Sequence, residues 1–345
     1  MSHEHDCCQH KKQPWYRNKI FIVTVILAGL CILAGVVPAL VPFRDNLIEY
    51  TRLIWIPMAI GLALGGVIDY YVPREYVSHV LASHQKTTVF RAVILGFFMS
   101  ACSHGILALA IQLYKKGAST AAVIAFLLAS PWANLPLTIL LIGFFGVGGG
   151  VFIIMSALVI AVVTGVIFQV MESTGYIAHN ENSSARDEKF SLAADFRQRF
   201  NNYHWTAAQL RRDVKGVWKG SVELGDMVLW WILIGMGLAS LAGAYVPTEI
   251  FQKYMGPDLP GMGVTLAFAT VIEVCSEGTA PVAFEIFNQT GAIGNSLVFL
   301  MAGVATDYTE IGLLWTNVGR KPAVLLPLIT VPQILLWGAV ANLLF

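Results

Sequence analysis

The sequence predicts an all-α protein: a polytopic helical membrane protein of about nine transmembrane segments, built as two homologous four-segment halves with broken helices. The chain of 345 residues is 56% hydrophobic and only 12% charged, which is typical of helical membrane proteins and excludes an ordinary soluble enzyme. Several apolar runs are long enough to cross a bilayer, and similar breaks interrupt the runs of the two halves. The net charge of +1 argues against nucleic acid as a partner.

Residues 1–19 form a polar tail that is rich in histidine and cysteine. Imidazole and thiolate are preferred ligands of soft and borderline metals, so the tail is a candidate for metal capture. Its candidate ligands are His3, His5, Cys7, Cys8 and His10. Their spacing fits no closed zinc-finger pattern, so the tail predicts at most a weak, exchangeable site. The alternative is a disordered tail or the trace of a purification tag.

Residues 20–43 predict an anchor helix, which we expect to be retained because the apolar run is too long for a cleaved signal peptide. Residues 44–171 form the predicted first half. Its four expected spans are Leu53–Val72, Phe90–Tyr114, Ala118–Phe145 and Val151–Met171. The second of these is interrupted by Cys102-Ser-His104-Gly, and the third by Asn134 between Pro131 and Pro136. A proline inside a helix frees a carbonyl, which membrane interiors tolerate only where protein or water can satisfy it.

Residues 172–222 form the predicted central loop, which we expect on the cytoplasmic side. Its aromatic and basic residues interleave in a way that suits a helix lying at the membrane interface. A simple solvated linker is the alternative. The basic N-terminal tail would place the N-terminus in the cytoplasm, and five spans would then put this loop outside, so charge leaves the side of the N-terminus open.

Residues 223–345 form the predicted second half. Its four expected spans are Leu224–Val246, Gly263–Phe287, Ala292–Val318 and Ala323–Leu344. The second is interrupted by Glu273-Val-Cys275-Ser-Glu277-Gly and the third by Asp307. Four crossings in each half would make the halves parallel, whereas re-entrant broken segments would change that parity.

An internal duplication links the breaks of the two halves. Cys102-Ser103 corresponds to Cys275-Ser276, and a Gly-Ala step follows each pair at nearly equal distance. Further along, the stretch that ends at Asn134 corresponds to the stretch that ends at Asp307. Paired halves with hydrophobic segments interrupted at matching places are the best sequence indication of a transporter's binding site.

The breaks also hold the ionisable residues of the apolar core. A charged side chain at the bilayer centre costs roughly 2.5–3.5 kcal/mol, so it indicates function. No Lys or Arg lies between Gly263 and Gly319, so these carboxylates must be protonated, face water or bind a cation. The predicted substrate or metal site comprises Cys102, His104, Asn134, Glu273, Cys275, Glu277, Asp307 and Glu310. Proton coupling is expected at Glu273, Glu277 and Asp307. The alternative is a packing role for small residues and thiols around a satisfied histidine.

Several other functions lack their motifs. The run from Gly146 to Gly150 has no Lys-Ser/Thr of a phosphate-binding loop, and the chain contains no Asp-Lys-Thr-Gly and no His-Glu-x-x-His. We therefore expect no enzyme activity and no cofactor. A channel stays open as an alternative.

These motifs together resemble the predicted permease family that includes the trivalent organoarsenical exporter ArsP and a subgroup of copper/zinc efflux transporters. The resemblance covers the chain from Leu53 to the C-terminus. It implies a core of about eight spans in two repeats and export of a thiophilic metal or metalloid. Members commonly have Cys-Ser-Cys where this chain has Cys102-Ser-His104, and imidazole in place of thiolate shifts the preference towards Zn(II) or mixed-ligand copper.

The resulting hypothesis is a multi-pass permease of the cell inner membrane that exports a zinc- or copper-type ion, or next a trivalent arsenical, and is coupled to protons. A metal-ion channel or uptake protein is the alternative, followed by an intramembrane enzyme. The expected partners are the metal or metalloid substrate, membrane lipid and, as an option, further copies of the chain.

Overall fold

The computed structural model describes residues 18–71, 87–99, 103–180, 206–272 and 276–345. All regular elements in these ranges are helices, which confirms the predicted fold class. Five helical stretches are long and apolar enough to cross a membrane. They are Pro38–Ile68, Leu135–Ser173, Gln209–Tyr245, Ile293–Asn317 and Arg320–Leu344. Other apolar segments of the described ranges are divided into helices of 10–17 residues, as the predicted broken helices require.

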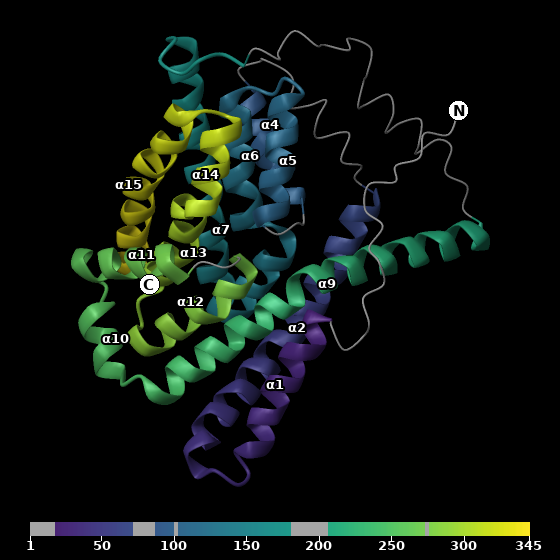
Figure 1. The fold of residues 1–345 in the computed structure, drawn as a ribbon, viewed down its shortest axis with the longest axis vertical. Helices are drawn as coiled ribbons and strands as arrows, with labels where there is room; N and C mark the ends of the chain where they lie inside the picture. The colour runs from purple at the N-terminus through teal and green to yellow at the C-terminus, as the bar shows by residue number, and fades with distance from the viewer. Residues whose placement is uncertain (1–17, 72–86, 100–102, 181–205, 273–275) are drawn as a thin grey trace.

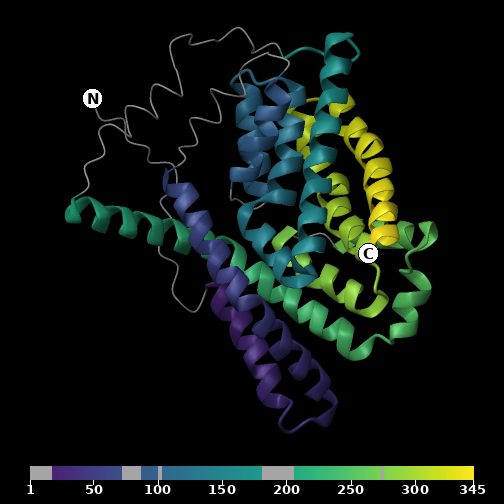
Figure 2. The ribbon, with the colours of Figure 1, turned by 180° about the vertical axis from the view of Figure 1, so that it is seen from behind.

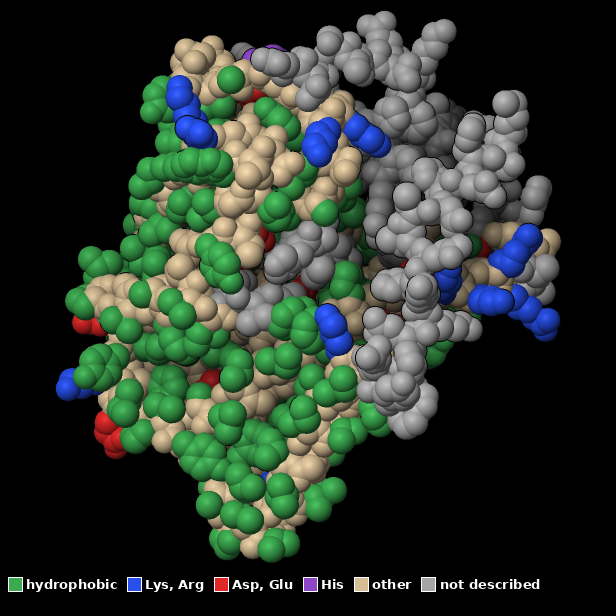
Figure 3. All heavy atoms as spheres, in the orientation of Figure 1, with side chains coloured by type: hydrophobic (Ala, Val, Ile, Leu, Met, Phe, Trp, Pro, Cys, Tyr) green, Lys and Arg blue, Asp and Glu red, His purple; other side chains and the backbone are tan. Residues whose placement is uncertain are grey.

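An N-terminal hairpin projects from the body of the protein (Figures 1 and 2). It consists of α1 (Lys19–Leu33) and α2 (Val41–Tyr71), joined through the short η2 (Pro38–Leu40). The helix α1 ends earlier than the expected anchor, and none of its residues is buried. Hydrophobic side chains cover this end of the molecule in Figure 3, which is the surface that lipid would contact.

The predicted span Phe90–Tyr114 is a pair of short helices, α4 (Thr88–Phe98) and α5 (Ser103–Lys115), which we call hairpin 1. Both helices pack against α6 (Thr120–Ala133). Gly96 near the end of α4 lies against Phe126 and Ser130 near the end of α6, so these two helices run in the same direction. A tight turn at Gly117, where φ is 96°, reverses the chain from α5 into α6. Helices of 11 and 13 residues rise only about 17–20 Å, which is too short for either helix to cross a bilayer by itself and is the length expected of a re-entrant pair.

The second half contains a matching pair, α11 (Leu259–Ile272) and α12 (Ser276–Thr290), which we call hairpin 2. Its first helix runs parallel to α13 (Ile293–Thr306), because contacts join their two starts and their two ends. At the start of α13 the Asn295 amide donates to the carbonyl of Gly256, just before α11, at 2.9 Å, and at the other end the hydroxyls of Thr270 and Thr306 are 2.7 Å apart. Gly291, with φ 70°, reverses the chain after α12.

A single extended residue interrupts each of the helices that follow the hairpins. Asn134 separates α6 from α7 (Leu135–Ser173), and Asp307 separates α13 from α14 (Tyr308–Asn317). A second break follows each at the same distance along the chain, at Gly146 with φ 71° and at Gly319 with φ 141°. After Gly319 the helix α15 (Arg320–Leu344) ends the chain. The predicted interruptions at Asn134 and Asp307 are therefore present.

The contacts between the halves occur in exchanged pairs. The long helices α2 and α9 (Ala207–Tyr245) pack together, as do α6 and α13. Hairpin 1 contacts α14 through α5, and hairpin 2 contacts α7 through α12. If neither hairpin crosses the membrane, each half has an odd number of crossings and the halves are inverted, whereas four crossings per half would make them parallel.

The region between the halves is more helical than expected. The helix α9 begins at Ala207, inside the predicted loop of residues 172–222, and continues into the expected span. Leu210, Val214 and Trp218 recur every four residues along one exposed face of its first turns. Such a stripe on a helix with Arg and Lys on its other faces favours a helix at the membrane interface over a solvated linker. The short helix α10 (Thr248–Tyr254), which follows α9, was not predicted.

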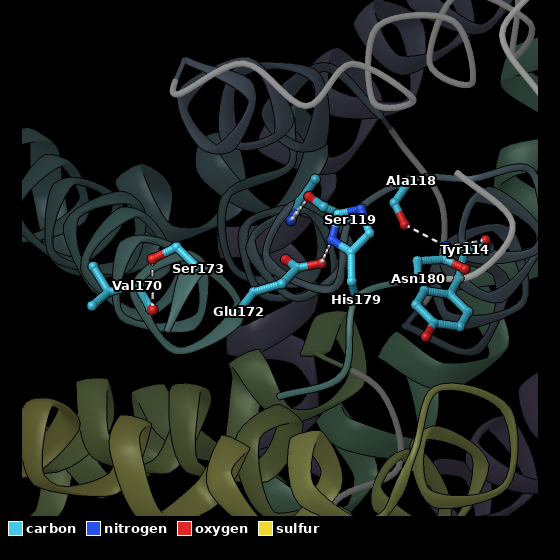
Figure 4. Close-up of polar contacts among 9 residues, drawn as sticks. Tyr114, Ala118, Ser119, Val170, Glu172, Ser173, His179 and Asn180 are labelled. Carbon is cyan, nitrogen blue, oxygen red and sulfur yellow. Dashed lines mark hydrogen bonds and ion pairs between the residues drawn. The ribbon is translucent and has the colours of Figure 1, made fainter. Parts of the chain in front are cut away.

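The segment after α7 holds the base of hairpin 1. Figure 4 shows the Asn180 amide pointing at this base. Asn180 Nδ2 donates to the carbonyls of Tyr114 and Ala118, at 2.6 and 2.8 Å. Beside it, His179 Nδ1 lies 3.3 Å from the Glu172 carboxylate. The Asn180 amide thus gives a donor to the Ala118 carbonyl and a second donor to the Tyr114 carbonyl, which also accepts from the backbone N–H of Gly117.

Candidate transport site

The predicted site residues differ in how far the structure describes them. Cys102, Glu273 and Cys275 lie outside the described residues. His104 is in the first turn of α5, but its side chain is outside them as well. The tail residues His3, His5, Cys7, Cys8 and His10 also lie outside. The structure therefore describes the side chains of Asn134, Glu277, Asp307 and Glu310, all of which are buried.

Asn134 and Glu277 join the two halves at the centre of the protein. Asn134 Nδ2 donates to Glu277 Oε1 at 2.9 Å, and the exposed fractions of the two residues are 0% and 3%. Asn134 Oδ1 accepts from the backbone N–H of Leu137 at 2.8 Å and caps the first turn of α7. Because the cap occupies the oxygen of the amide, its nitrogen is directed towards Glu277. The break in the first half and the start of α12 in the second half are thus in direct contact.

Asp307 has the same place in the second half but a different chemistry. Its carboxylate accepts from the backbone N–H of Thr309 at 2.8 Å and from the Thr309 hydroxyl. It therefore caps α14 as Asn134 caps α7, although its side chain is an ionisable carboxyl group where Asn134 has an amide. Glu310 lies one turn further along α14 and is 1% exposed.

Two further polar groups are buried near these breaks without a hydrogen-bond partner. They are the indole N–H of Trp132, two residues before Asn134, and the hydroxyl of Ser276, next to Glu277. A buried donor without an acceptor costs about 1–3 kcal/mol, so each group needs an explanation such as a bound species or a second conformation. Ser130 is satisfied, because its hydroxyl donates to the carbonyl of Met99 at 3.1 Å and holds the end of α4 against α6.

The family of the chain follows from comparison with known proteins. Residues 42–343 match the model of a family described as predicted permease. The chain belongs to this family. The permease is 24% identical over 284 residues to the UPF0718 protein YcgR of Bacillus subtilis. The matched region covers 81% of this chain and 90% of YcgR.

A second relative is "Putative permease Rv2963" of Mycobacterium tuberculosis, which is 24% identical over 249 residues. That match covers 67% of this chain and 59% of Rv2963, so the permease spans little more than half of this relative. No solved structure matches the permease.

The helices that meet at the centre of the permease contain no basic residue. This holds for α6, α12, α13 and α14, whereas α12 and α14 supply Glu277 and Glu310. A carboxylate in a low-dielectric interior is costly unless it is paired, hydrogen-bonded or protonated. The Asn134 amide meets part of that need for Glu277. The centre is consequently suited to a cation or to exchangeable protons, and unsuited to an anion.

Within the described ranges, no group of three or more His, Cys, Asp or Glu side chains is placed to hold a metal ion. The thiols expected as soft ligands are outside those ranges. Their neighbours in sequence are described, since Ser103 begins α5 and Ser276 begins α12. Glu277, in the first turn of α12, contacts Asn134, which follows α6. The start of α12 therefore lies beside the C-terminal end of α6.

Sequence reasoning did not assign three of the polar residues found in these helices. Ser130 and Trp132 lie in the motif that marked the break, but their types alone gave no reason to choose them. Glu285, further along α12, is 4% exposed and is hydrogen-bonded to Tyr50 of α2. An acidic residue between two phenylalanines in an apolar segment was a signal that could have identified it.

Proposed function

We propose that the permease exports a thiophilic metal or metalloid across the cell inner membrane in exchange for protons. A zinc- or copper-type ion is favoured, and a trivalent arsenical comes next. The observation that supports this most is the buried hydrogen bond between Asn134 and Glu277. It joins a broken helix of one half to a re-entrant hairpin of the other, which is where secondary transporters with inverted repeats hold their substrate.

The chemistry of the expected ligands supports a cationic, sulfur-binding substrate. Cys102 and Cys275 precede the first turns of α5 and α12, and His104 is in the first of these turns. Thiolate is the form that binds metal, so protons compete with the metal for the same groups. The carboxylates at the centre give the substrate and the protons a shared negative region.

The fold also supports alternating access. Each hairpin contacts the broken helix of the other half, so a movement of one half against the other changes the contacts at both breaks. The bond between Asn134 and Glu277 would form in one arrangement and open in another. A proton or metal at Glu277 alters the charge that Asn134 meets, and this links occupancy to movement.

The test is metal tolerance and metal content in cells that express the wild type or single variants. The cells are challenged with zinc, copper, arsenite and methylarsenite. Wild type is expected to raise tolerance and lower the content of at least one of these. Cys102→Ser, Cys275→Ser and Glu277→Gln are expected to remove that effect at equal expression.

Glu223→Gln is the matched control, because Glu223 is an exposed residue of α9 whose carboxylate lies 3.6 Å from the Lys219 ammonium. It is expected to behave as wild type. A rise in cellular metal on expression of the wild type would instead favour a channel or uptake protein. Chemical conversion of the substrate without net flux would favour an intramembrane enzyme.

A further inference from the structure

Glu285 is a buried carboxylate at the base of hairpin 2, away from the breaks. The Tyr50 hydroxyl of α2 donates to its Oε2, and Gln289 Nε2 donates to its Oε1 at 2.6 Å. Gly243 of α9 lies against Oε1 so closely that a Cβ atom there would overlap it. Three helices therefore enclose this one acidic group, and each of its oxygens accepts from a neutral donor.

We infer that Glu285 is a proton-binding site of the permease, formed with Tyr50 and reached from the surface through Gln289. A hydroxyl can donate to a carboxylate or accept from a carboxylic acid, so Tyr50 can satisfy Glu285 in both protonation states. The Tyr50 ring packs edge-on against Phe284, with ring centroids 6.2 Å apart, which holds the hydroxyl in place. The pair can thus take up and release a proton without repacking.

A line of polar side chains connects Glu285 with the surface. Gln289 Oε1 accepts from the Thr248 hydroxyl at 2.6 Å, and Thr248 is exposed on α10. Because that bond occupies the oxygen of Gln289, its NH₂ group is directed at Glu285. On another side, a cavity of about 240 Å³ lies beside Glu285, but its other lining residues are almost all apolar. Apolar cavities stay dry, so the polar line is the route for the proton.

The surroundings of Glu285 offer it no positive partner in the described part of the chain. From α2 it faces Tyr50 and the like charge of Glu49. The charged residues of α10, Glu249 and Lys253, are exposed. The helix α9 has no charged residue after Asp226, α13 has none, and the acid of α7, Glu172, is at its far end. A carboxylate in such surroundings changes its protonation instead of forming an ion pair.

The position of Glu285 ties its protonation to the central site. It lies on the same helix as Glu277, a little over two turns away, with Pro281 between them, so one helix joins the two acids. In the internal duplication its counterpart in α5 is Gln112, so this acid is specific to the second half. Resting on the proposed function, the proton that responds to a pH gradient would bind at Glu285, while protons at the breaks compete with the substrate.

Infrared spectroscopy of the purified permease tests proton binding without any transported substrate. The carbonyl stretch of a protonated carboxylic acid is followed as the pH falls. Wild type is expected to show a band that Glu285→Gln lacks and that the exposed control Glu223→Gln keeps. Tyr50→Phe removes a donor to the ionised carboxylate, so it is expected to move the midpoint of this band to higher pH by about 1 unit. Identical spectra for wild type and Glu285→Gln would overturn the inference.

Circular dichroism and gel filtration establish that each variant is folded. If Glu285→Gln does not fold, Tyr50→Phe decides, and a midpoint equal to that of wild type overturns the inference. Coupling is then measured in vesicles with Zn²⁺ as the probe. Glu285→Gln is expected to exchange Zn²⁺ downhill without response to a pH gradient, and Glu277→Gln is expected to lose Zn²⁺ movement altogether. Absence of Zn²⁺ movement in wild type would count against the zinc preference alone, because the infrared result is independent of it.

Discussion

Replacement of Asn134 by Asp separates two roles that one side chain performs. An aspartate keeps the oxygen that caps α7 at Leu137 but replaces the NH₂ group with a second carboxylate oxygen. That oxygen would stand 2.9 Å from Glu277 Oε1, where the donor now is. The variant therefore tests the contact between the halves and leaves the helix start intact.

The expected loss is large. Two unit charges 4 Å apart interact with about 4 kcal/mol at an effective dielectric constant of 20, and the present separation is shorter. The lost hydrogen bond to a charged acceptor adds about 1.5–3 kcal/mol. Protonation of one carboxylate relieves the repulsion, so the loss is greatest at alkaline pH and shrinks as the pH falls. Asn134→Ala removes the cap as well, which costs about 1 kcal/mol, and its loss should not depend on pH in this way.

Thermal unfolding of the purified protein in detergent, over a series of pH values, measures both effects. We expect Asn134→Asp to unfold at lower temperature than wild type at alkaline pH and to approach wild type in acid. Transport should fall with stability at alkaline pH. If Asn134→Asp matched wild type at alkaline pH, the contact between Asn134 and Glu277 would not join the halves, and the site as described would be refuted.

Three other predictions follow from single contacts. Asn180→Ala removes a side-chain donor from two carbonyls at the base of hairpin 1, so thermal unfolding should show a loss of about 1–3 kcal/mol. The partly exposed Asn317→Ala, which loses only bonds within its own helix, should show little change. Trp132→Phe removes a buried N–H that has no acceptor, so the protein should be as stable as wild type or more stable. Reduced transport at unchanged stability would assign that N–H to the transport cycle. Lower stability would contradict the reasoning. The Tyr70 hydroxyl donates to the buried Asp213 at 3.0 Å, and this hydrogen bond raises the pKa of Tyr70. Tyr70→Phe removes the bond, so the free energy of unfolding should fall by about 1 kcal/mol. The alkaline transition of that phenol should also disappear from ultraviolet titration.

The sequence predicted the breaks better than the crossings. Asn and Asp favour the start of a helix, and Pro131 and Pro136 flank Asn134, so local chemistry was sufficient to place the interruptions at Asn134 and Asp307. Gly146 likewise lies in the gap between two predicted spans, where its positive φ changes the direction of the chain. Such signals are local, and the structure agrees with them.

The crossings depend on packing that a single segment does not reveal. Phe90–Tyr114 is long and apolar enough to span, yet the structure divides it into two helices that pack on α6. A re-entrant helix enclosed by protein is as apolar as one that faces lipid, so hydropathy cannot distinguish them. The partner of Glu285 is hidden from the sequence for a similar reason, because Tyr50 is 235 residues away.

The breaks at Asn134 and Asp307 have the same place in their halves, but their side chains differ in chemistry. Helix capping explains how two different side chains can form the same break. Asn134 and Asp307 each place a side-chain oxygen on the backbone N–H groups of the next helix, so either residue forms the break. The remaining atoms are then free to differ, with an NH₂ donor in one half and a carboxylate oxygen in the other. Gln112 and Glu285 differ in the same way. A duplication that kept the helix starts constant could therefore gather acids in one half without disturbing either break.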